Sequence, residues 1–260
     1  MKKWVRFELY GREQIGLLED GVVRACRGDL FGRIEITATR APLDSIKLLP
    51  PVNPGKIIGL WNNFHARADK EGWDRPPHPL YFMKTPGGLL GSGQVIPRPL
   101  AYAGAVFFEG ELGIVIGEPC VNITPEQADE YILGYTCVND VTAKDILFSD
   151  PSFPQWTRAK GFDGFCPVGP CLVTDASPDD WIVRTLVDGV EQQNYPVSDM
   201  FFSPREIVAH LSNDMTLAPG DVIACGTSLG AGEMPDGCQV EVVIEPIGAL
   251  VNPFAGRRRG

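Results

Sequence analysis

Glycine and proline interrupt this sequence along its whole length. The 260 residues include 29 glycines and 23 prolines. Proline removes a helix hydrogen bond and clashes with the preceding turn, and glycine loses more backbone entropy on folding than other residues do. Long helices are therefore disfavoured, and short strands joined by tight turns are favoured. We predict a mixed, β-rich α+β fold with few helices.

The N-terminal residues carry a hairpin pattern. Two apolar-rich runs occur at residues 4–9 and 15–18, and polar residues alternate with apolar ones in the first run. Asp20-Gly21, a dipeptide typical of two-residue hairpin turns, follows the second run and precedes Val22-Val23. These features predict a small antiparallel sheet near the N-terminus.

A stiff, proline-rich segment follows this region. Pro50, Pro51 and Pro54 restrict the backbone there. Such a segment is typical of a connection between two structural units. The sequence therefore predicts a small N-terminal β lobe at residues 1–52 and a larger domain at residues 53–256.

Apolar runs and helix-start signals outline the larger domain. Apolar and β-branched runs predict strands at residues 56–60, 80–83, 106–116, 171–173, 182–187, 222–225 and 240–244. Helices are predicted at residues 65–72, at a segment that begins with Thr124-Pro125, and at residues 203–213. The last two segments begin with an N-cap residue followed by proline, which is a common way to start a helix.

Charge and hydropathy argue against two classes of partner. The formal net charge is −10, whereas nucleic-acid binding requires clustered Lys and Arg. The three arginines at residues 257–259 are interpreted as a solvated tail. No run of about 18 apolar residues is present to span a membrane, and no signal-peptide core follows the N-terminal lysines. We expect neither nucleic acid nor a membrane as a partner.

The seven cysteines lack the spacing of a disulfide framework or a zinc site. Their number is odd, and no CxxC pair occurs. Most of them are expected to be small buried apolar residues, as in proteins of a reducing compartment. The expected location of the protein is the cytoplasm.

One predicted strand carries two neighbouring acidic residues. In VFFEGELGIVI at residues 106–116, the even positions suit a core, whereas Glu109 and Glu111 share the opposite face. Two carboxylates on one face repel each other unless something positive compensates them. Glutamates at i and i+2 suit a hard cation such as Mg²⁺, Mn²⁺ or Ca²⁺. A strand with one solvated face is the alternative interpretation.

A third carboxylate stands at the end of another strand-like run. Asp140 closes the sequence YTCVND at residues 135–140. Functional sites are often built at strand ends, but a single aspartate there more commonly serves a turn or a cap. Neither acidic motif identifies a site when it is taken alone.

Six segments together resemble the fumarylacetoacetate hydrolase family. They occur in the family's order as ExELxxVIG, GYTxxND, KxFDxFxPxGP, SDMxF, LSxxMTLxPGDVIxxGT and IxxIGxLxN, at residues 109–117, 134–140, 160–170, 198–202, 211–227 and 244–252. The resemblance implies a mixed β-sandwich roll, often homodimeric. It also implies an enzyme that uses a divalent cation to act on a small 2-oxo acid or its enol.

The resemblance implies a metal site made of three carboxylates. Glu109, Glu111 and Asp140 match the family residues that hold one divalent cation. We expect Mg²⁺, with Mn²⁺ or Ca²⁺ as alternatives. Two adjacent oxygens of a 2-oxo acid could chelate such a cation, which would act as a Lewis acid and stabilise an enolate.

Four further residues match positions that act on the substrate in this family. Lys160 matches a lysine near the metal, and His65 matches a histidine on a lid-like segment, so both are expected to be catalytic. A histidine that reaches the site could take a proton from water as a general base. Gln155 and Thr227 match residues that contact the substrate.

The sequence departs from the family's pattern at three places. Ser228 follows Gly-Thr where the family usually has proline, and Lys144 stands where an arginine is common. Relatives that hydrolyse or decarboxylate often carry a glutamate three residues after the histidine, and here that position is Ala68. Asp69 and Glu71 lie nearby but out of register. The pair of residues that would activate water is therefore incomplete.

Three functions remain as hypotheses. The first is hydrolysis of a C–C bond in a 2,4-dioxo acid that resembles acylpyruvate or fumarylpyruvate. The second uses the same metal-stabilised enolate for isomerisation, decarboxylation or hydration of a 2-hydroxydienoate or 2-oxo acid, and Ala68 favours it. The third is a protein that binds metal or metabolite without catalysis. Retention of three carboxylates together with Lys160 argues against the third hypothesis.

Overall fold

The computed structural model describes residues 1–256, so the predicted basic tail lies outside the described residues. Strands dominate this part of the chain and form three sheets, which confirms the predicted β-rich α+β class. The helices within residues 1–256 are short, and none is long and apolar enough to cross a membrane. The seven cysteines are free thiols here, and six of them are buried.

The largest sheet contains twelve strands in the order β4-β3-β2-β1-β13-β11-β10-β16-β6-β7, with β5 paired to β1 and β8 paired to β13. Their bounds are β1 Lys2–Leu9, β2 Arg12–Glu19, β3 Val22–Gly28, β4 Ile34–Pro42, β5 Lys47–Leu49, β6 Ile57–Trp61, β7 Leu80–Lys84, β8 Leu89–Leu90, β10 Gly110–Ile116, β11 Ile132–Asn139, β13 Cys166–Thr174 and β16 Val222–Ala224. Of the predicted metal site, Glu111 lies on β10, Glu109 directly precedes β10, and Asp140 directly follows β11.

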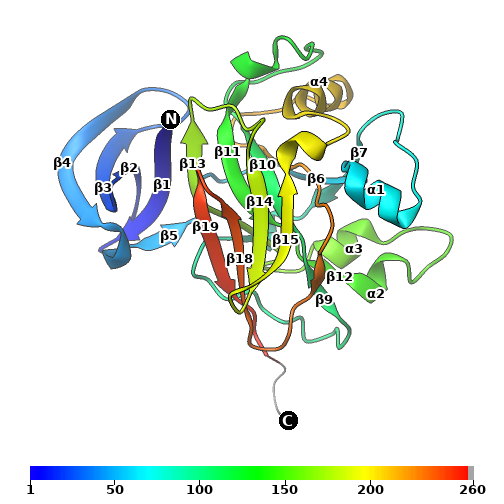
Figure 1. The fold of residues 1–260 in the computed structure, drawn as a ribbon. Helices are drawn as coiled ribbons and strands as arrows, with labels where there is room; N and C mark the ends of the chain where they lie inside the picture. Colours follow the sequence, from blue (N-terminus) through cyan, green and yellow to red (C-terminus); the bar gives the residue numbers. More distant parts are fainter. Residues whose placement is uncertain (257–260) are drawn as a thin grey trace.

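Two smaller sheets and a few helices complete the fold. A four-stranded sheet contains β14 Ile182–Val187, β15 Val190–Pro196, β18 Gln239–Ile244 and β19 Gly248–Pro253, and a three-stranded sheet contains β9 Val106–Phe108, β12 Thr142–Ala143 and β17 Gly232–Glu233. The helices are α1 His65–Glu71, α2 Lys144–Leu147, α3 Trp156–Lys160 and α4 Pro204–Asp214, with 3₁₀ turns η1 Leu43–Ser45, η2 Pro86–Gly88, η3 Ala128–Glu130 and η4 Val197–Asp199. Figure 1 shows the four-stranded sheet lying across β10, β11 and β13, with α1, α2 and α3 at one side.

The N-terminal strands stand to one side of the main body but share its sheet. The predicted hairpin is present, and Asp20 and Gly21 take φ values of 47° and 76° in the turn between β2 and β3. The strand β1 pairs with β2 on one edge and with β13 on the other, so the lobe continues the large sheet (Figure 1). The boundary between residues 52 and 53 remains a prediction.

Two of the three predicted helices are present and one is not. Helix α4 begins with the expected capping box, in which the Ser203 hydroxyl accepts from the Glu206 N–H while the Glu206 carboxylate accepts from the Ser203 N–H. The helix predicted to start at Thr124 is wrong. Gln127 does accept from the Thr124 N–H, but the segment forms only a turn and η3. Strand β11 begins at Ile132, which leaves no room for a longer helix.

The predicted strand at residues 106–116 is two strands that belong to different sheets. The first, β9, pairs with β12 and β17, whereas β10 pairs with β11 and β16. Glu109 occupies the break between them. The acidic pair therefore lies where the chain passes from one sheet to the other, and not on one continuous solvated face.

Gly110 lets the four-stranded sheet pack tightly against β10. A Cβ atom at this position would lie 2.0 Å from Oγ1 of Thr185 on β14, which is much closer than real Cβ contacts. The glycine between the two glutamates is thus required by the distance between sheets. The interior between these sheets is filled by buried side chains such as Leu112, Ile114 and Val183.

Candidate functional site

Three carboxylates meet at the break between β9 and β10. Glu109 and Glu111 flank Gly110, and Asp140 directly follows β11, whose Asn139 pairs with Gly110. One oxygen atom from each of the three carboxylates lies within 4.8 Å of the others. Their exposed fractions are only 9%, 1% and 0%, so the group is nearly removed from water. The structure thus brings together the three residues that the sequence proposed as metal ligands.

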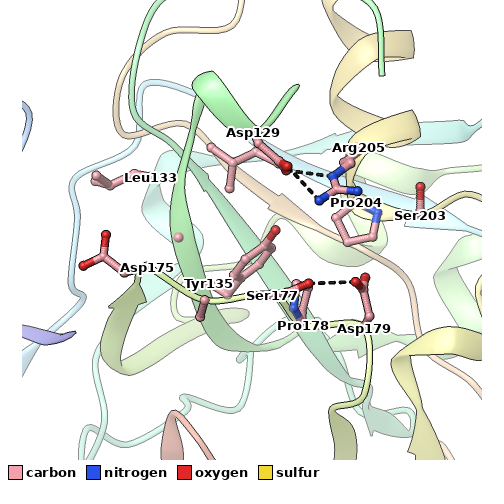
Figure 2. A pocket seen from close by; sticks show the side chains of 13 residues that line it. Asp129, Leu133, Tyr135, Asp175, Ser177, Pro178, Asp179, Ser203, Pro204 and Arg205 are labelled. Atoms are coloured by element: carbon pink, nitrogen blue, oxygen red, sulfur yellow. Dashed lines mark hydrogen bonds and ion pairs between the residues drawn. The ribbon is translucent and has the colours of Figure 1, made fainter. Parts of the chain in front are cut away.

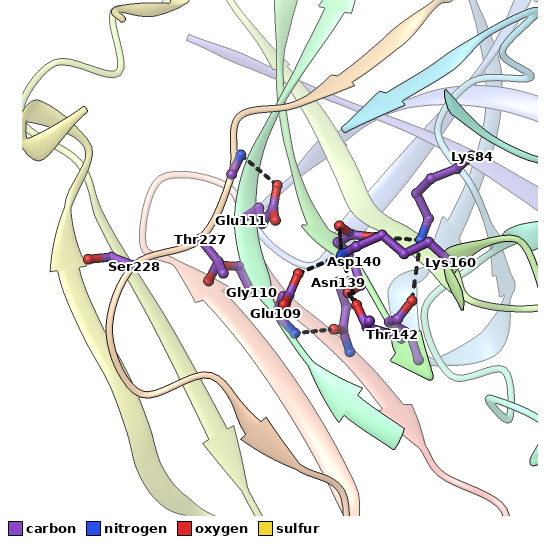
Figure 3. Close-up of polar contacts among 12 residues, drawn as sticks. Lys84, Glu109, Gly110, Glu111, Asn139, Asp140, Thr142, Lys160, Thr227 and Ser228 are labelled. Atoms are coloured by element: carbon purple, nitrogen blue, oxygen red, sulfur yellow. Dashed lines mark hydrogen bonds and ion pairs between the residues drawn. The ribbon is translucent and has the colours of Figure 1, made fainter. Parts of the chain in front are cut away.

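Two buried lysines enter this acidic cluster. Nζ of Lys160, at the end of α3, donates to Oε2 of Glu109 at 2.7 Å and to Oγ1 of Thr142 at 2.8 Å, and it also donates to Asp140. Nζ of Lys84, at the end of β7, donates to the other oxygen of Asp140 (Figure 3). Both lysines are 3% exposed. The prediction that Lys160 lies beside the carboxylates is therefore matched by its position.

Lys84 was missed by the sequence analysis. It lies on the same face of β7 as Phe82, and both side chains are buried. Alternate residues of a strand share a face, so a lysine that follows the inward-facing Phe82 by two positions could have been noticed as an inward charge. Its partner is 56 residues away in the chain, which left no local signal for the pairing.

Burial and mutual repulsion set the protonation of these carboxylates. Burial raises the pKa of Glu111 well above its ordinary value, and the charges of Asp140 and Glu109 raise it further. Burial alone would also raise the pKa of Asp140, but Lys160 and Lys84 outweigh it and hold that pKa below the ordinary value. Without a cation, the site therefore favours the protonated form of Glu111 and the ionised form of Asp140.

The donor set fits a hard divalent cation. Oε2 of Glu111 accepts from the Gly226 N–H at 2.7 Å, whereas Oε1 is buried and has no hydrogen-bond partner among residues 1–256. A buried carboxylate oxygen without a donor is costly. A cation between Glu111, Glu109 and Asp140 would satisfy it, and three carboxylate oxygens are ligands that Mg²⁺, Mn²⁺ and Ca²⁺ accept.

A small pocket opens beside the cluster. Its volume is about 100 Å³. Glu109, Lys160 and Thr227 line it. Its wall also contains five aromatic and two basic side chains, namely Trp61, Trp73, Phe82, Phe148, Trp156, Arg67 and Lys144. Apolar walls with a few convergent charges are typical of sites for small anionic ligands.

Thr227, which the sequence predicts to contact the substrate, lines the pocket. Its Oγ1 donates to the Gly110 carbonyl at 3.0 Å and accepts from Nε2 of Gln193 at 2.8 Å. The residue is buried and lines the pocket. It thus connects the pocket wall directly to the backbone between the two glutamates.

His65 and Gln155 do not line the pocket. His65 is the first residue of α1, and its exposed ring lies 4.2 Å from the ring of Phe201, measured between centroids, with the two planes tilted by 55°. Nε2 of Gln155 donates to the Phe153 carbonyl at 3.0 Å, just before α3. The roles expected for both residues remain predictions. From α1 it is Arg67 and Glu71 that reach the pocket.

A wider hollow lies elsewhere, at the start of β11 and α4. It measures about 470 Å³ and is lined by polar groups that include Asp129, Tyr135, Asp179 and Arg205 (Figure 2). Asp129 is already paired with Arg205 there at 2.7 Å. None of the predicted site residues belongs to this hollow, whereas Glu109, Lys160 and Thr227 line the smaller pocket.

Comparison with known families settles the relationship that the motifs indicated. The family model described as "Fumarylacetoacetate (FAA) hydrolase C-terminal" matches residues 56–255. This chain belongs to the fumarylacetoacetate hydrolase family. A second model, "Rv2993c-like, N-terminal", matches residues 2–51. The family resemblance stated from the six motifs is confirmed.

Several fumarylacetoacetate hydrolase relatives align with most of the chain. Protein Rv2993c of Mycobacterium tuberculosis is 42% identical over 86% of this chain and 84% of its own length. Oxaloacetate tautomerase YisK of Bacillus subtilis is 36% identical over 81% of this chain and 73% of its own length. These relatives, together with the neighbours in structure, indicate that the protein is an enzyme of this family.

Solved structures share the whole architecture. A 2-hydroxyhepta-2,4-diene-1,7-dioate isomerase from Mycobacterium marinum superposes with a TM-score of 0.90, 36% identity and complete coverage of both chains. A maleylpyruvate hydrolase from Sphingobium sp. SYK-6, solved with manganese(II) and pyruvate, superposes with a TM-score of 0.80 at 24% identity, over 99% of this chain and 100% of that one. The second likeness shows the fold alone, and together they confirm the predicted β-rich family fold.

Proposed function

We propose that this protein is a divalent-metal-dependent isomerase that shifts a proton within a small 2-oxo acid or its enol. One observation carries the proposal. Ala68, which stands where a water-activating glutamate is common, is fully buried, and His65 is held on Phe201 outside the pocket. Helix α1 therefore presents no His–Glu pair to activate water. An isomerisation needs no water, so we rank it ahead of C–C hydrolysis, which the sequence had placed first.

Relatives with related chemistry support this ranking. The Bacillus subtilis relative is named as an oxaloacetate tautomerase, and the Mycobacterium marinum structure is that of a diene-dioate isomerase. Both names describe rearrangement of a 2-oxo or 2-hydroxy acid without loss of carbon. Each protein is 36% identical to this chain.

We propose that Glu109, Glu111 and Asp140 hold one Mg²⁺, which Mn²⁺ or Ca²⁺ could replace. When bound, the cation would act as a Lewis acid toward the 2-oxo group and lower the energy of an enolate. Once metal binding has ionised all three carboxylates, these and the two ammonium groups of Lys84 and Lys160 together carry one net negative charge. A divalent cation reverses that sign, so the loaded site attracts an anionic substrate.

The chain's own groups then bind and shield the substrate. Lys160 lines the pocket, and Asp140 and Glu109 raise the pKa of its ammonium against the effect of burial, so a positive charge stays beside a bound anion. The aromatic wall excludes water from the enolate, which strengthens electrostatic interactions and opposes hydrolysis. The small volume suits a short oxo acid.

The deciding experiment is an ultraviolet assay of metal-stripped protein with and without Mg²⁺ or Mn²⁺. The substrates are the enol form of oxaloacetate, 2-hydroxydienoates, acylpyruvates and fumarylpyruvate, with products identified by mass. We expect metal-dependent conversion of an enol to its keto isomer of identical mass. Release of pyruvate and a second acid would support the hydrolase hypothesis instead, and tight metal binding without any turnover would support the non-catalytic one.

A further inference from the structure

Gln193 is a buried polar residue on the strand that faces the acidic pair. It lies on β15 and is 1% exposed, whereas its neighbours Gln192 and Asn194 point outward and are exposed. Burying an amide is costly unless all of its polar atoms find partners. The partners that Gln193 has found identify its role.

Both ends of the Gln193 amide are used. Its Oε1 accepts from the Gly110 N–H at 3.0 Å and from Oγ1 of Thr185 at 2.9 Å. Its Nε2 donates to Oγ1 of Thr227 at 2.8 Å and to the Leu229 carbonyl at 3.2 Å. One side chain therefore joins β14, the strand with the acidic pair and the loop that follows β16.

These contacts fix the two peptide groups that separate the glutamates. The Gly110 N–H belongs to the peptide after Glu109 and is held by Gln193. The Gly110 carbonyl belongs to the peptide before Glu111 and accepts from the hydroxyls of Tyr195 and Thr227. The relative orientation of the two carboxylates follows from these two peptide planes, so it is held by the opposite sheet.

The same contacts determine what Thr227 can offer to a ligand. Its hydroxyl hydrogen is directed to the Gly110 carbonyl, and one lone pair accepts from Gln193. A hydroxyl has one hydrogen and two lone pairs, so a single lone pair remains for the pocket. Loss of the Gln193 amide would release the hydroxyl to rotate.

We infer that Gln193 is a positioning residue that holds the Glu109–Glu111 pair and the Thr227 hydroxyl in one fixed geometry, and thereby sets both metal affinity and substrate KM. The expected effect on metal affinity depends only on the carboxylate site. The expected effect on KM rests on the proposed function.

The test compares Gln193→Met with Gln192→Met. Both variants replace an amide by a thioether of similar length on the same strand, but only the first loses the contacts to Gly110 and Thr227. Mn²⁺ is titrated into metal-stripped protein by calorimetry, and the electron paramagnetic resonance spectrum of bound Mn²⁺ reports the ligand geometry. We expect Gln193→Met to weaken Mn²⁺ binding by about 10-fold or more and to change the spectrum, as for other groups that orient metal ligands. Gln192→Met should match the wild type.

A second variant keeps the test decisive if Gln193→Met does not fold. Thr185→Val removes only the hydroxyl that donates to Oε1 of Gln193, and we expect a smaller change in the same direction. With saturating Mn²⁺, Gln193→Met and Thr185→Val should each raise KM more than they lower kcat. A folded variant with wild-type Mn²⁺ affinity and spectrum would overturn the inference. Weakened Mn²⁺ binding in a protein that turns over no oxo acid would instead count against the proposed function alone.

Discussion

The ammonium of Lys84 forms a buried ion pair with Asp140, at the carboxylate oxygen opposite the one that Lys160 contacts. Each oxygen of this ligand is therefore already bound by a positive charge when the cation is absent. The lysines hold the acidic cluster together without metal, and they weaken the attraction of the cluster for a cation.

Replacing Lys84 by methionine tests this balance. Removal of one partner from a buried ion pair leaves charge uncompensated, so we expect the metal-free variant to lose about 3 kcal/mol of unfolding free energy. The variant should also bind Mg²⁺ more tightly, because a competing positive charge is gone. Thermal unfolding with and without Mg²⁺ measures both effects, and Lys70→Met on the exposed face of α1 is the control. A variant that Mg²⁺ stabilises less than the wild type would contradict the prediction.

Replacing Glu109 by glutamine should abolish tight metal binding while the fold survives. The amide keeps the shape of the carboxylate but removes the charge that a hard cation requires. We expect metal affinity to fall by more than about 100-fold, beyond the range for groups that only orient ligands. Calorimetry and circular dichroism provide the measurement, with Glu118→Gln at the exposed end of the same segment as the control. Unchanged affinity in a folded Glu109→Gln protein would remove Glu109 from the metal site.

Metal binding should release protons as Glu111 ionises. Burial raises the pKa of Glu111 well above 4.5, so folded metal-free protein holds a proton that the unfolded chain has lost. This group stabilises the metal-free fold fully below its unfolded pKa, and the contribution is lost as the pH rises toward the folded pKa. A cation needs the ionised form, so its affinity should increase with pH over the same interval.

Calorimetry in two buffers of different ionisation enthalpy measures this proton release directly. Glu118→Gln, at an exposed glutamate away from the site, is the control and should release as many protons as the wild type. Metal affinity that is independent of pH across the interval would show that Glu111 is already ionised in the metal-free protein.

Restoring a glutamate at Ala68 should not create a hydrolase. Ala68 is fully buried in α1, so a charged side chain there would lie unpaired in the interior. We expect Ala68→Glu to destabilise the protein by about 3 kcal/mol or more and to yield no pyruvate from acylpyruvates. Thermal unfolding and product analysis measure both outcomes, with Lys70→Glu as the exposed control. A stable Ala68→Glu protein that cleaves acylpyruvates would mean that α1 can rotate so that residue 68 faces the pocket.

The sequence predicted those parts of the fold that have local signals. Alternation placed Glu109 and Glu111 beside each other, and the N-cap pattern at Ser203 predicted α4 correctly. β4 was missed because it lies at the edge of the sheet, where six of its nine residues are exposed and only Ala41 is buried. The break at Glu109 was missed because nothing local distinguishes one long strand from two short ones.

The supporting residues of the site could not be predicted for a different reason. Gln193 contacts Gly110 across 83 residues of sequence, and Lys84 contacts Asp140 across 56. Such pairs are created by sheet packing, and a single sequence contains no record of which strands will face each other. The three carboxylates and Lys160 came from a family resemblance, which carried that long-range information.

The pairing of β1 with β13 has a consequence for shortened forms of this protein. Without residues 1–49, β13 would lose its neighbour along Leu172, Val173 and Thr174 and would present unpaired backbone groups to solvent. Exposed strand edges recruit strands from other molecules. The isolated larger domain would thus be prone to self-association, and the N-terminal strands act as a built-in shield against it.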